Sequence, residues 1–292
     1  MGKDIAEMSD AARRVFTRAD EILGRKLSEI CFEGPADVLN ATDTSQPAIF
    51  VMSAAVWAAM QERGLDSEFA ATAMAGLSLG EYTALHLAGW IGFEDGLRLV
   101  AERGRLMQAA AESSGGSMVS IMGVGEDVVQ KICDEAADGE VLGPANFNCP
   151  GQIVISGSKG ACERSVAIAE KHSARAIPLV VAGAFHSSLM EPAVDGLKSA
   201  LAAVSINPTQ IGVVSNVSAD YHAGPDEVRT LLREQIAKPI RWQASIERLI
   251  AEGYDRFVEV GPGRVLTGLL RKISRAATGV NFSSASAFEK RG

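Results

Sequence analysis

One serine of this chain is flanked by the pattern that activated serine nucleophiles use. Residues 76–80 (Gly-Leu-Ser-Leu-Gly) follow an apolar run, residues 69–75, and precede a run of helix-forming residues, 81–88, that ends at Gly89. A strand, Gly-x-Ser-x-Gly and a helix in this order are typical of a nucleophile elbow around Ser78. The turn is tight, so we expect the serine backbone to be strained and side chains at residues 76 and 80 to collide with their surroundings.

The chemistry that Ser78 could perform is covalent acyl transfer. Its oxygen would stand above the first turn of the following helix, where unpaired N–H groups and the helix dipole favour a developing negative charge. The backbone N–H of Leu79 is the expected oxyanion donor. The alternative is a turn between a strand and a helix without chemistry, because Gly-x-Ser-x-Gly often arises by chance. A base elsewhere in the chain must decide between the two.

Histidine is the usual base for a serine hydroxyl, and the chain has four histidines. We expect His86 to pack within the helix behind the serine, and His172 to end another helix, where a cation complements the dipole. His222 falls in a polar loop. His186 follows a strand-like segment at the junction of two predicted domains, where a base would face the cleft between them. On position alone, a packed or capping role for His186 stays open.

The elements that would position these residues fall into two domains. Residues 115–183 predict the order β-α-β-β-α-β of a ferredoxin-like unit, with glycines at both ends as hinges. Its strands are expected at 117–124, 141–146, 152–158 and 175–181, and its helices at 126–137 and 161–172. Strands and helices alternate in residues 1–114 and 184–292, which indicates an α/β large domain. The expected fold is α/β, with a hydrolase-like large domain, a mostly parallel sheet and an inserted ferredoxin-like small domain.

The large domain is expected to contain several long helices and a few short strands. Ser9 would cap a first helix, and Pro47 would lie in the first turn of another. The helices are predicted at 9–23, 45–61, 93–111, 189–204, 226–236 and 245–252, and the strands at 211–217 and 256–260. Residues 261–263 (Gly-Pro-Gly) lack Walker spacing and indicate a strand-to-helix turn rather than a phosphate loop. The stretch after Ser274 is small and polar and contains no motif.

Composition narrows the classes of partner. The net charge is -8, the pI is about 5.2 and no dense Lys/Arg run occurs, so we expect no nucleic-acid partner. The longest apolar run, residues 48–60, is too short to span a bilayer, and the first residues do not form a signal peptide. A cytoplasmic protein without a membrane partner is expected. The cysteines have neither C-x-x-C nor metal spacing, so no metal site is expected; they are Cys31, Cys133, Cys149 and Cys162.

The motifs around Ser78 and His186 resemble those of a known family. Residues 76–82 (Gly-Leu-Ser-Leu-Gly-Glu-Tyr) and 183–190 (Gly-Ala-Phe-His-Ser-Ser-Leu-Met) are similar to segments of the malonyl-CoA:acyl carrier protein transacylases. Further segments agree in the same order, namely residues 46–48, 103–107, 146–152, 235–242 and 259–268. The resemblance covers nearly the whole chain, to about Lys272.

The resemblance implies a role for several residues. Ser78 would attack the malonyl thioester, and His186 would take its proton and later activate the thiol of the carrier. No third carboxylate is expected, because the family orients its histidine through a main-chain carbonyl near Gln235. Arg103 would bind the malonyl carboxylate in the bidentate manner of a guanidinium. Phe185 resembles the wall that disfavours an α-methyl branch on the acyl group.

Two of these assignments have an alternative in which the residue takes no part in the chemistry. Without the resemblance, Arg103 would be interpreted as a helix-surface arginine in a weak ion pair, and Gln235 as a solvated helix end. The implied partner is acyl carrier protein, with malonyl-CoA as substrate and no cofactor. Two other functions stay open, namely an acyl-hydrolase or editing enzyme on the same fold and a truncated, non-catalytic partner of a synthase. Nothing in the sequence separates fatty-acid from polyketide synthesis.

Two departures from the family pattern concern the acyl site. The family begins with a strand and a Phe-Pro-Gly-Gln-Gly type of loop whose glutamine supports the oxyanion site, and this chain begins just after that point. We therefore expect Met1 to be an internal methionine and the natural start to lie upstream. Leu77 stands where the family commonly has a histidine before the serine, which leaves the acyl preference open.

Overall fold

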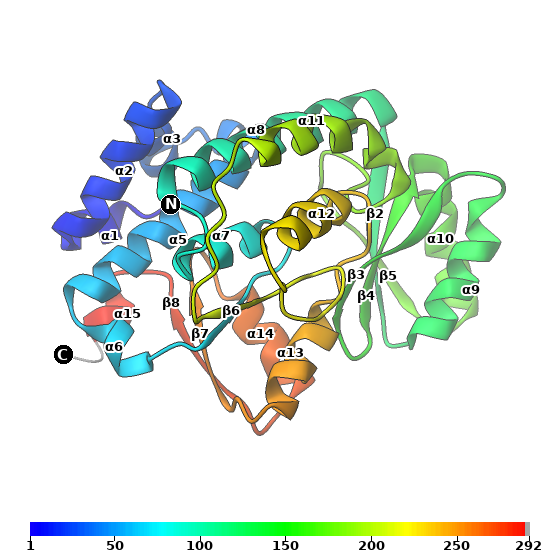
Figure 1. Ribbon diagram of the computed structural model, residues 1–292. Helices are drawn as coiled ribbons and strands as arrows, with labels where there is room; N and C mark the ends of the chain where they lie inside the picture. Colours follow the sequence, from blue (N-terminus) through cyan, green and yellow to red (C-terminus); the bar gives the residue numbers. More distant parts are fainter. Residues whose placement is uncertain (290–292) are drawn as a thin grey trace. The chain divides into compact units, whose positions relative to one another are not determined.

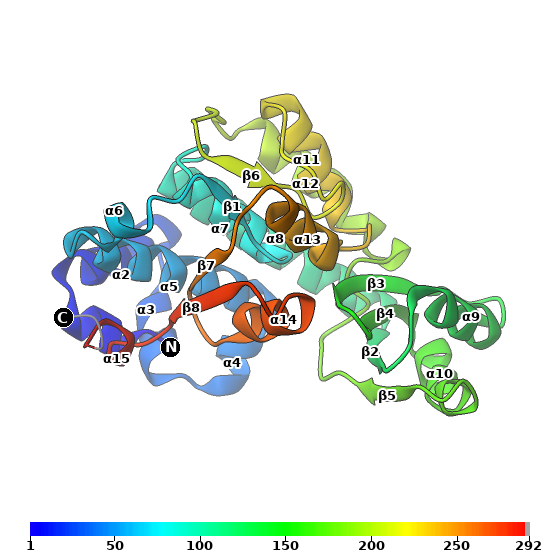
Figure 2. The ribbon, with the colours of Figure 1, turned by 90° about the horizontal axis from the view of Figure 1, so that it is seen from below.

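The computed structural model describes residues 1–289, which divide into two compact units (Figure 1, Figure 2). The first unit takes in residues 1–104 and 203–214 and the chain from residue 250 onward. The second takes in residues 105–202 and 215–249. Ser78, Leu79 and Arg103 belong to the first unit, whereas His186, Gln235 and Phe185 belong to the second.

The first unit begins with a series of helices. They are α1 (Lys3–Met8), α2 (Asp10–Leu23), α3 (Leu27–Glu33), α4 (Ala36–Asn40), α5 (Thr42–Glu62) and α6 (Leu65–Phe69). The predicted boundaries of α2 are confirmed: the Ser9 hydroxyl accepts a hydrogen bond from the Ala12 N–H at 3.1 Å, and Gly24 ends the helix with a φ of 62°. The prediction for α5 was wrong at its start. The helix begins at Thr42, so Pro47 lies inside it as a buried residue and lacks the N–H that an interior helix position would donate.

Two pairs of parallel strands complete the first unit. β1 (Ala73–Ala75) pairs with β6 (Gly212–Val214), and β7 (Arg256–Val260) pairs with β8 (Thr278–Phe282). The strand predicted at 69–75 is shorter than expected, because α6 extends through Phe69. The strand predicted at 211–217 is likewise shorter. α14 (Val265–Ile273) connects β7 to β8, and α15 (Ser286–Glu289) follows. β8 was not predicted; it lies in the stretch after Ser274, where no motif was found.

The second unit contains a four-stranded antiparallel sheet. Its order is β3-β4-β2-β5, formed by β2 (Gly116–Met122), β3 (Leu142–Cys149), β4 (Gln152–Ser158) and β5 (Arg175–Pro178). The helices α9 (Glu126–Ala137) and α10 (Lys159–Lys171) lie against this sheet (Figure 1), with a core that includes Val119, Ile121, Val129, Ile132 and Ile155. The predicted β-α-β-β-α-β order is confirmed, although β5 ends at Pro178 rather than at residue 181.

Helices that follow the sheet in the chain also belong to the second unit. They are α11 (Glu191–Ala202), preceded by the short 3₁₀ helix η1 (Ser188–Met190), α12 (Pro225–Gln235) and most of α13 (Trp242–Ala251). α7 (Leu79–Leu87) lies wholly in the first unit, whereas α8 (Phe93–Ser114) contributes residues to both. Whether residues 115–183 alone form an inserted domain stays a prediction. The mixture of parallel strand pairs, an antiparallel sheet and covering helices confirms the α/β class.

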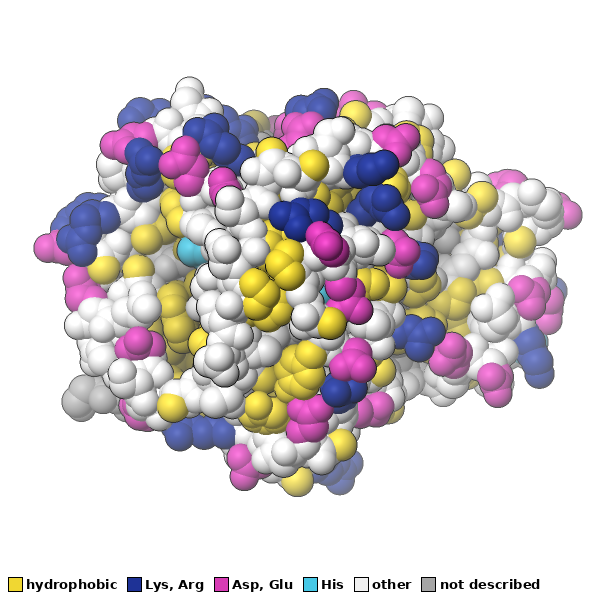
Figure 3. All heavy atoms as spheres, viewed as in Figure 1, with side chains coloured by type: hydrophobic (Ala, Val, Ile, Leu, Met, Phe, Trp, Pro, Cys, Tyr) yellow, Lys and Arg dark blue, Asp and Glu magenta, His cyan; other side chains and the backbone are white. Residues whose placement is uncertain are grey.

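Several features bear on the expected partners. Within residues 1–289, no helix combines the length and apolar character needed to cross a membrane. The same residues contain no group of three or more His, Cys, Asp or Glu side chains that could hold a metal ion. On the face shown in Figure 3, acidic and basic side chains are intermixed rather than gathered by sign. That face therefore offers no extended basic surface of the kind that nucleic acid requires.

Candidate active site

The turn between β1 and α7 has the strained geometry of a nucleophile elbow. Ser78 has a φ of 53° and a ψ of -108°, a conformation that residues with a side chain rarely adopt. A Cβ on Gly76 would lie 2.0 Å from the carbonyl carbon and oxygen of Gly80, so only glycine fits there. The expected collision at Gly80 was wrong: a Cβ there would meet no atom within 4 Å. The space beside Gly80 is open.

The first N–H of α7 is available to a ligand. The Gly80 N–H donates to the Leu77 carbonyl at 2.9 Å, and the Glu81 N–H donates to the Ser78 carbonyl at 3.2 Å. No group in the described part of the chain accepts a hydrogen bond from the N–H of Leu79. This N–H is one of the donors that every helix start leaves unsatisfied, and it follows the serine directly. It can therefore donate to an oxyanion that forms on a carbonyl attacked by Ser78.

Arg103 lies beside the serine rather than on the surface. Its side chain is buried, with 1% exposed. Nη2 donates to the Ser78 hydroxyl oxygen at 3.0 Å, and Nη1 donates to the Gln46 side-chain oxygen at 2.5 Å. The guanidinium carbon lies 5.1 Å from the centre of the Tyr82 ring, a cation–π contact. The alternative of a surface arginine in a weak ion pair is therefore wrong.

Residues from three helices meet at this cation, and all of them belong to the first unit. Gln46 comes from α5, Tyr82 from α7 and Arg103 from α8. A Cβ on Gly104 would lie 2.8 Å from the Thr42 carbonyl oxygen, so glycine permits α8 to approach the start of α5 closely. Neither Gln46 nor Tyr82 was predicted as a site residue, although both lie in segments that carried the resemblance. Their signal was their place in those motifs; their contact with Arg103 depends on the packing of helices.

Burial sets the electrostatics around Arg103. Desolvation lowers the pKa of its guanidinium, while Tyr82 and Glu81 favour the charged form. Desolvation also raises the pKa of the Tyr82 phenol, so this ring is neutral. A guanidinium stays protonated in proteins, so the site contains a fixed positive charge at hydrogen-bond distance from a serine oxygen. A carboxylate is the ligand that such a charge favours.

His186 is held by the main chain of the second unit. It has a φ of 58° and 5% of it is exposed. Its Nδ1 lies 2.7 Å from the carbonyl oxygen of Gln235, and its backbone N–H donates to the Ile236 carbonyl at 3.1 Å. Because a carbonyl only accepts hydrogen bonds, Nδ1 carries the proton and donates it to this contact. Nε2 is then the basic nitrogen of the neutral ring.

Gln235 lies inside the protein rather than at its surface. Gln235 is 0% exposed, so its interpretation as a solvated helix end is wrong. Its side-chain nitrogen donates to the Asn216 side-chain oxygen at 3.4 Å, and the Arg241 N–H donates to the Asn216 carbonyl at 2.8 Å. Asn216 therefore connects the end of α12 to the segment before α13. Asn216 was not predicted as a site residue, because no motif marks it and only the fold brings it to Gln235.

Two of the other histidines, His86 and His172, are held by contacts with neighbouring residues. The Nδ1 of His86 lies 3.0 Å from the Ile91 carbonyl, and its ring packs beside those of Phe50 and Phe93, so the expected packing is confirmed. Burial lowers the pKa of His86. At the end of α10, the Nε2 of His172 lies 2.8 Å from a carboxylate oxygen of Glu135. His222 is buried.

Phe185 has a fixed position next to His186. It is half-buried and packs with Leu179 against a small cluster of buried residues, Met118, Ala145 and Val154. Its ring is therefore supported by the sheet of the second unit. The Phe185 side chain is therefore held in place next to His186 in the chain.

The segment after β7 forms the structural turn that was expected. The Glu259 carboxylate accepts hydrogen bonds from the N–H groups of Leu266 and Thr267, each at 2.9 Å. These are first-turn donors of α14, so a side chain already occupies the anion-binding end of this helix. The Gly-Pro-Gly run at 261–263 is therefore a strand-to-helix connection and not a phosphate loop.

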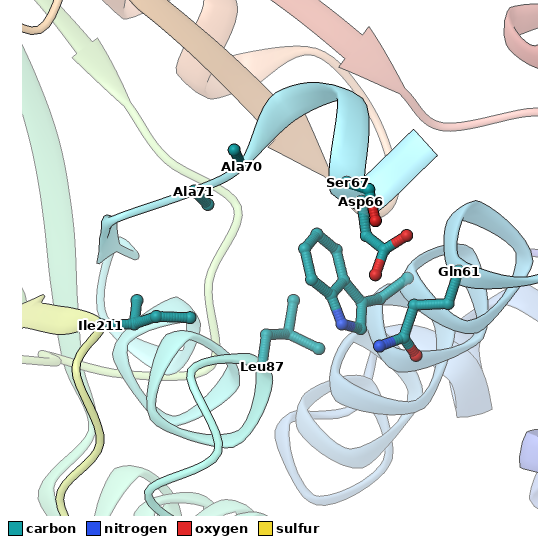
Figure 4. A pocket seen from close by; sticks show the side chains of 8 residues that line it. Gln61, Asp66, Ser67, Ala70, Ala71, Leu87 and Ile211 are labelled. Carbon is teal, nitrogen blue, oxygen red and sulfur yellow. The ribbon is translucent and has the colours of Figure 1, made fainter. Parts of the chain in front are cut away.

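Two depressions in the surface of the first unit lie away from the predicted site residues of that unit. One has a volume of about 320 Å³ and is shown in Figure 4, with Gln61, Asp66 and Leu87 among its lining residues. The other, of about 310 Å³, shares Trp57, Gln61 and Leu87 with it. Neither is lined by Ser78 or Arg103. The chemistry in this unit is concentrated at the elbow instead.

A strained serine beside an oxyanion donor and a buried cation, on an α/β scaffold, defines a serine-dependent transferase or hydrolase of acyl groups. Residues 1–286 match the acyl transferase domain family, and the chain belongs to this family.

Within this family, the chain is similar to proteins named malonyl CoA-acyl carrier protein transacylase. The chain is 43% identical over 277 residues to the malonyl CoA-acyl carrier protein transacylase of Bacillus subtilis (strain 168), covering 94% of this chain and 86% of the relative. It is 40% identical over 287 residues to the protein of the same name from Escherichia coli (strain K12), covering 97% and 92%.

Solved structures agree with this placement. The acyl carrier protein S-malonyltransferase of Vibrio cholerae matches with a TM-score of 0.94 and 38% identity, covering 100% of this chain and 95% of that one. A malonyl-transacylase solved in complex with its type II PKS acyl-carrier protein matches with a TM-score of 0.93 and 36% identity, covering 99% and 93%. These matches confirm the α/β fold expected from the sequence.

Proposed function

We propose that this chain transfers a malonyl group from malonyl-CoA to the phosphopantetheine thiol of an acyl carrier protein, through an acyl-enzyme on Ser78. The observation that carries the proposal is the 3.0 Å contact between Arg103 Nη2 and the Ser78 oxygen. It brings a carboxylate-binding cation next to a nucleophile in a strained elbow. The names of the relatives support the donor, and the solved complex of a malonyl-transacylase with an acyl-carrier protein supports the acceptor.

In the first half-reaction, the Ser78 oxygen attacks the thioester carbonyl of malonyl-CoA. Nε2 of His186 takes the hydroxyl proton, and the N–H of Leu79 donates to the oxyanion of the tetrahedral intermediate. The intermediate collapses, the carbon–sulfur bond breaks, and the histidine returns the proton to the sulfur of coenzyme A. Nδ1 stays bound to the Gln235 carbonyl, which keeps the ring in the required tautomer and stabilises it while it is charged.

In the second half-reaction, the carrier's thiol takes the place of the serine hydroxyl. His186 removes the thiol proton, the sulfur attacks the malonyl-serine ester, and the proton passes to the Ser78 oxygen as the ester bond breaks. The substrate carboxylate stays on Arg103 through both steps. Because water would compete with the thiol for the ester, transfer also requires that water be excluded from the acyl-enzyme until the thiol attacks.

The position of Arg103 favours a short acyl group. With the guanidinium at hydrogen-bond distance from the attacking oxygen, the carboxylate that it binds must lie close to the reacting carbonyl. A malonyl group, in which one methylene separates the two, meets this requirement better than a longer dicarboxylic acyl group. Phe185 would disfavour an α-methyl branch, and one methyl group contributes about 1–3 kcal/mol to such discrimination.

The chain's own residues supply every group that these steps need, so the proposal includes no cofactor and no metal. The carrier would serve fatty-acid or polyketide synthesis. We place the protein in the cytoplasm, because all four cysteines are buried free thiols. Burial raises the pKa of Cys31 and Cys162 to about 11 and that of Cys133 to about 12, so these thiols are unreactive and compatible with a reducing compartment.

Intact-mass spectrometry tests the proposal in two stages. The protein is first mixed with malonyl-CoA, and we expect one malonyl adduct, which Ser78→Ala abolishes and which Ser53→Ala, a change to a serine on α5, leaves in place. Phosphopantetheinylated acyl carrier protein is then added, and the mass of the adduct should move to the carrier. An equal adduct on Ser78→Ala would contradict the nucleophile. Steady release of free malonate without the carrier would show a hydrolase instead.

A further inference from the structure

The turn that carries His186 has a shape that its backbone does not favour. His186 has a φ of 58°, and residues with a side chain relax to negative φ unless their surroundings prevent it. Its Nδ1 and its N–H reach the carbonyls of Gln235 and Ile236, at the end of α12. Both of these contacts require that residues 184–189 already form the turn. A restraint within the turn itself is therefore needed.

The side chain of Ser187 connects the two sides of this turn. Its hydroxyl donates to the carbonyl oxygen of Ala184 at 2.7 Å, before His186, and accepts from the N–H of Leu189 at 3.3 Å, after it. The backbone of Ser187 is extended, with a φ of -131° and a ψ of 170°, and is not strained. One hydroxyl thus spans residues 184–189 with the histidine between its two partners.

The hydroxyl is also what satisfies a buried acceptor. Ala184 is 0% exposed, and within residues 1–289 no other group donates to its carbonyl. A Cβ on Gly116 would lie 2.4 Å from the Cβ of Ala184, so the start of β2 packs closely against this side of the turn. Burying a carbonyl without a donor shifts an equilibrium about 5- to 100-fold against the conformation that buries it. The Ser187 hydroxyl therefore favours the turn over relaxed forms.

The neighbouring serine provides a contrast within the same segment. Ser188 is exposed, and its hydroxyl takes part in no hydrogen bond within the described part of the chain. The two residues are adjacent and have the same side chain, but only Ser187 spans the turn. Loss of the Ser188 hydroxyl should leave the turn as it is.

We propose that Ser187 is a positioning residue for the general base, because its hydroxyl holds the turn in which Nδ1 of His186 reaches the Gln235 carbonyl. The inference rests on the acyl transfer proposed above and adds a side chain that acts through the histidine. If the turn relaxes, Nδ1 loses its acceptor, and Nε2 is no longer directed at the nucleophile. Ser187 should therefore affect the chemical step, whereas binding of malonyl-CoA depends on Arg103 and should not change.

Acylation kinetics test this role with three variants. The readout is the rate of Ser78 acylation as a function of malonyl-CoA concentration, in Ser187→Ala, Ser188→Ala and Ser187→Thr. The main-chain bonds to α12 remain in Ser187→Ala, so we expect a moderate loss, about 5- to 10-fold in the maximal rate, with the half-saturating concentration unchanged. Ser188→Ala should behave as the wild type. Ser187→Thr keeps the hydroxyl, and its extended backbone suits a β-branched residue, so it should restore most of the rate.

Three kinetic outcomes would overturn the inference. They are a wild-type maximal rate in Ser187→Ala, a loss confined to the half-saturating concentration, and an equal loss in Ser187→Thr.

Nuclear magnetic resonance measures the position of the histidine without substrate. In protein labelled with ¹⁵N-histidine, the Nδ1–H of His186 should give a downfield, slowly exchanging proton signal, assigned by its absence in His186→Ala. We expect this signal to be lost or broadened by exchange in Ser187→Ala and to persist in Ser188→Ala and Ser187→Thr. Circular dichroism shows whether each variant is folded. An unchanged Nδ1–H signal in Ser187→Ala would overturn the inference even if the rate falls.

The malonyl-CoA measurement separates this inference from the proposed function. If wild-type protein forms no malonyl adduct on Ser78, the proposed function fails and the inference fails with it. If the adduct forms and Ser187→Ala keeps the wild-type rate and signal, only the inference fails.

Discussion

Ser78 and His186 both have a positive φ, which residues with a side chain rarely adopt, but the two turns are stabilised by different parts of the protein. Ser78, with a φ of 53°, is contacted by the side chain of Arg103, which is itself held by Gln46 and Tyr82. His186, with a φ of 58°, is held by the main-chain carbonyls of Gln235 and Ile236. One turn depends on side chains from three helices and the other on the backbone of one segment.

This difference follows from what each group needs. A fixed positive charge at Ser78 can only come from a side chain, and a buried cation needs polar or aromatic partners that are side chains too. An imidazole needs only one acceptor for Nδ1, and a main-chain carbonyl supplies it without depending on residue type. Substitutions around Ser78 should therefore have larger effects than substitutions of the side chains around His186.

The largest expected effect comes from removing the imidazole itself. In His186→Ala, the rate of Ser78 acylation by malonyl-CoA should fall by about 10²–10⁴-fold, the usual contribution of a general base. Quenched-flow mass spectrometry measures this rate. His172→Ala, which removes a histidine paired with Glu135 at the end of α10, is the control and should leave the rate unchanged. An unchanged rate in His186→Ala would remove this residue as the base.

The next effect is on folding and concerns the glycines of the elbow. In Gly76→Ala the new Cβ meets the Gly80 carbonyl at 2.0 Å, and such overpacking costs about 1–3 kcal/mol or more. The midpoint of thermal unfolding, followed by circular dichroism, should fall clearly. Gly80→Ala is the matched variant, and it should unfold at or above the wild-type temperature because its Cβ meets no atom within 4 Å. Equal losses in the two variants would contradict this description of the elbow.

A smaller effect is expected at the partner of Arg103. Gln46→Leu removes the acceptor of Nη1, so the guanidinium loses one of the contacts that fix its position. A hydrogen bond to a charged group contributes about 1.5–3 kcal/mol, so kcat/KM for malonyl-CoA should fall about 10-fold or more, chiefly through KM. Gln61→Leu, at an exposed position of the same helix, should have no such effect. Equal kcat/KM values in the two variants would show that Gln46 does not position Arg103.

The smallest expected effect is at Gln235. Gln235→Met keeps the main-chain carbonyl that holds His186 and removes the side-chain bond to Asn216. We expect the acylation rate to stay near that of the wild type, while the free energy of unfolding falls by about 1 kcal/mol. Steady-state kinetics and urea unfolding measure the two quantities. A rate loss comparable to that of His186→Ala would show that the Gln235 side chain, rather than its carbonyl, orients the histidine.

The difference between contacts within one segment and contacts between distant segments also explains what the sequence could and could not predict. Local patterns were sufficient where structure is determined by neighbours in the chain. Ser9 and Gly24 mark the ends of α2, and the ferredoxin-like order follows from alternating runs. The elbow was predicted because its glycines, its strand and its helix are contiguous. The predicted N-terminal boundary of α5 was wrong, because Pro47 was placed in a first turn although the helix starts earlier.

Contacts that depend on packing between distant segments could not be predicted in this way. The burial of Arg103 results from α5, α7 and α8 meeting, and only the family motif at residues 103–107 distinguished this residue from the exposed Arg98. Asn216 is near Gln235 only in the fold. β8 was missed because it is short and offers only two alternating apolar residues, Val280 and Phe282, within a stretch of small and polar residues.

The most direct test of this account is a competition between donors. Wild-type protein is mixed with equal concentrations of malonyl-CoA and acetyl-CoA, quenched early and examined by intact mass and peptide mapping. A cation beside the nucleophile predicts that the acyl group found on Ser78 is almost entirely malonyl. Equal amounts of acetyl and malonyl on Ser78, or an acyl group on another residue, would contradict it.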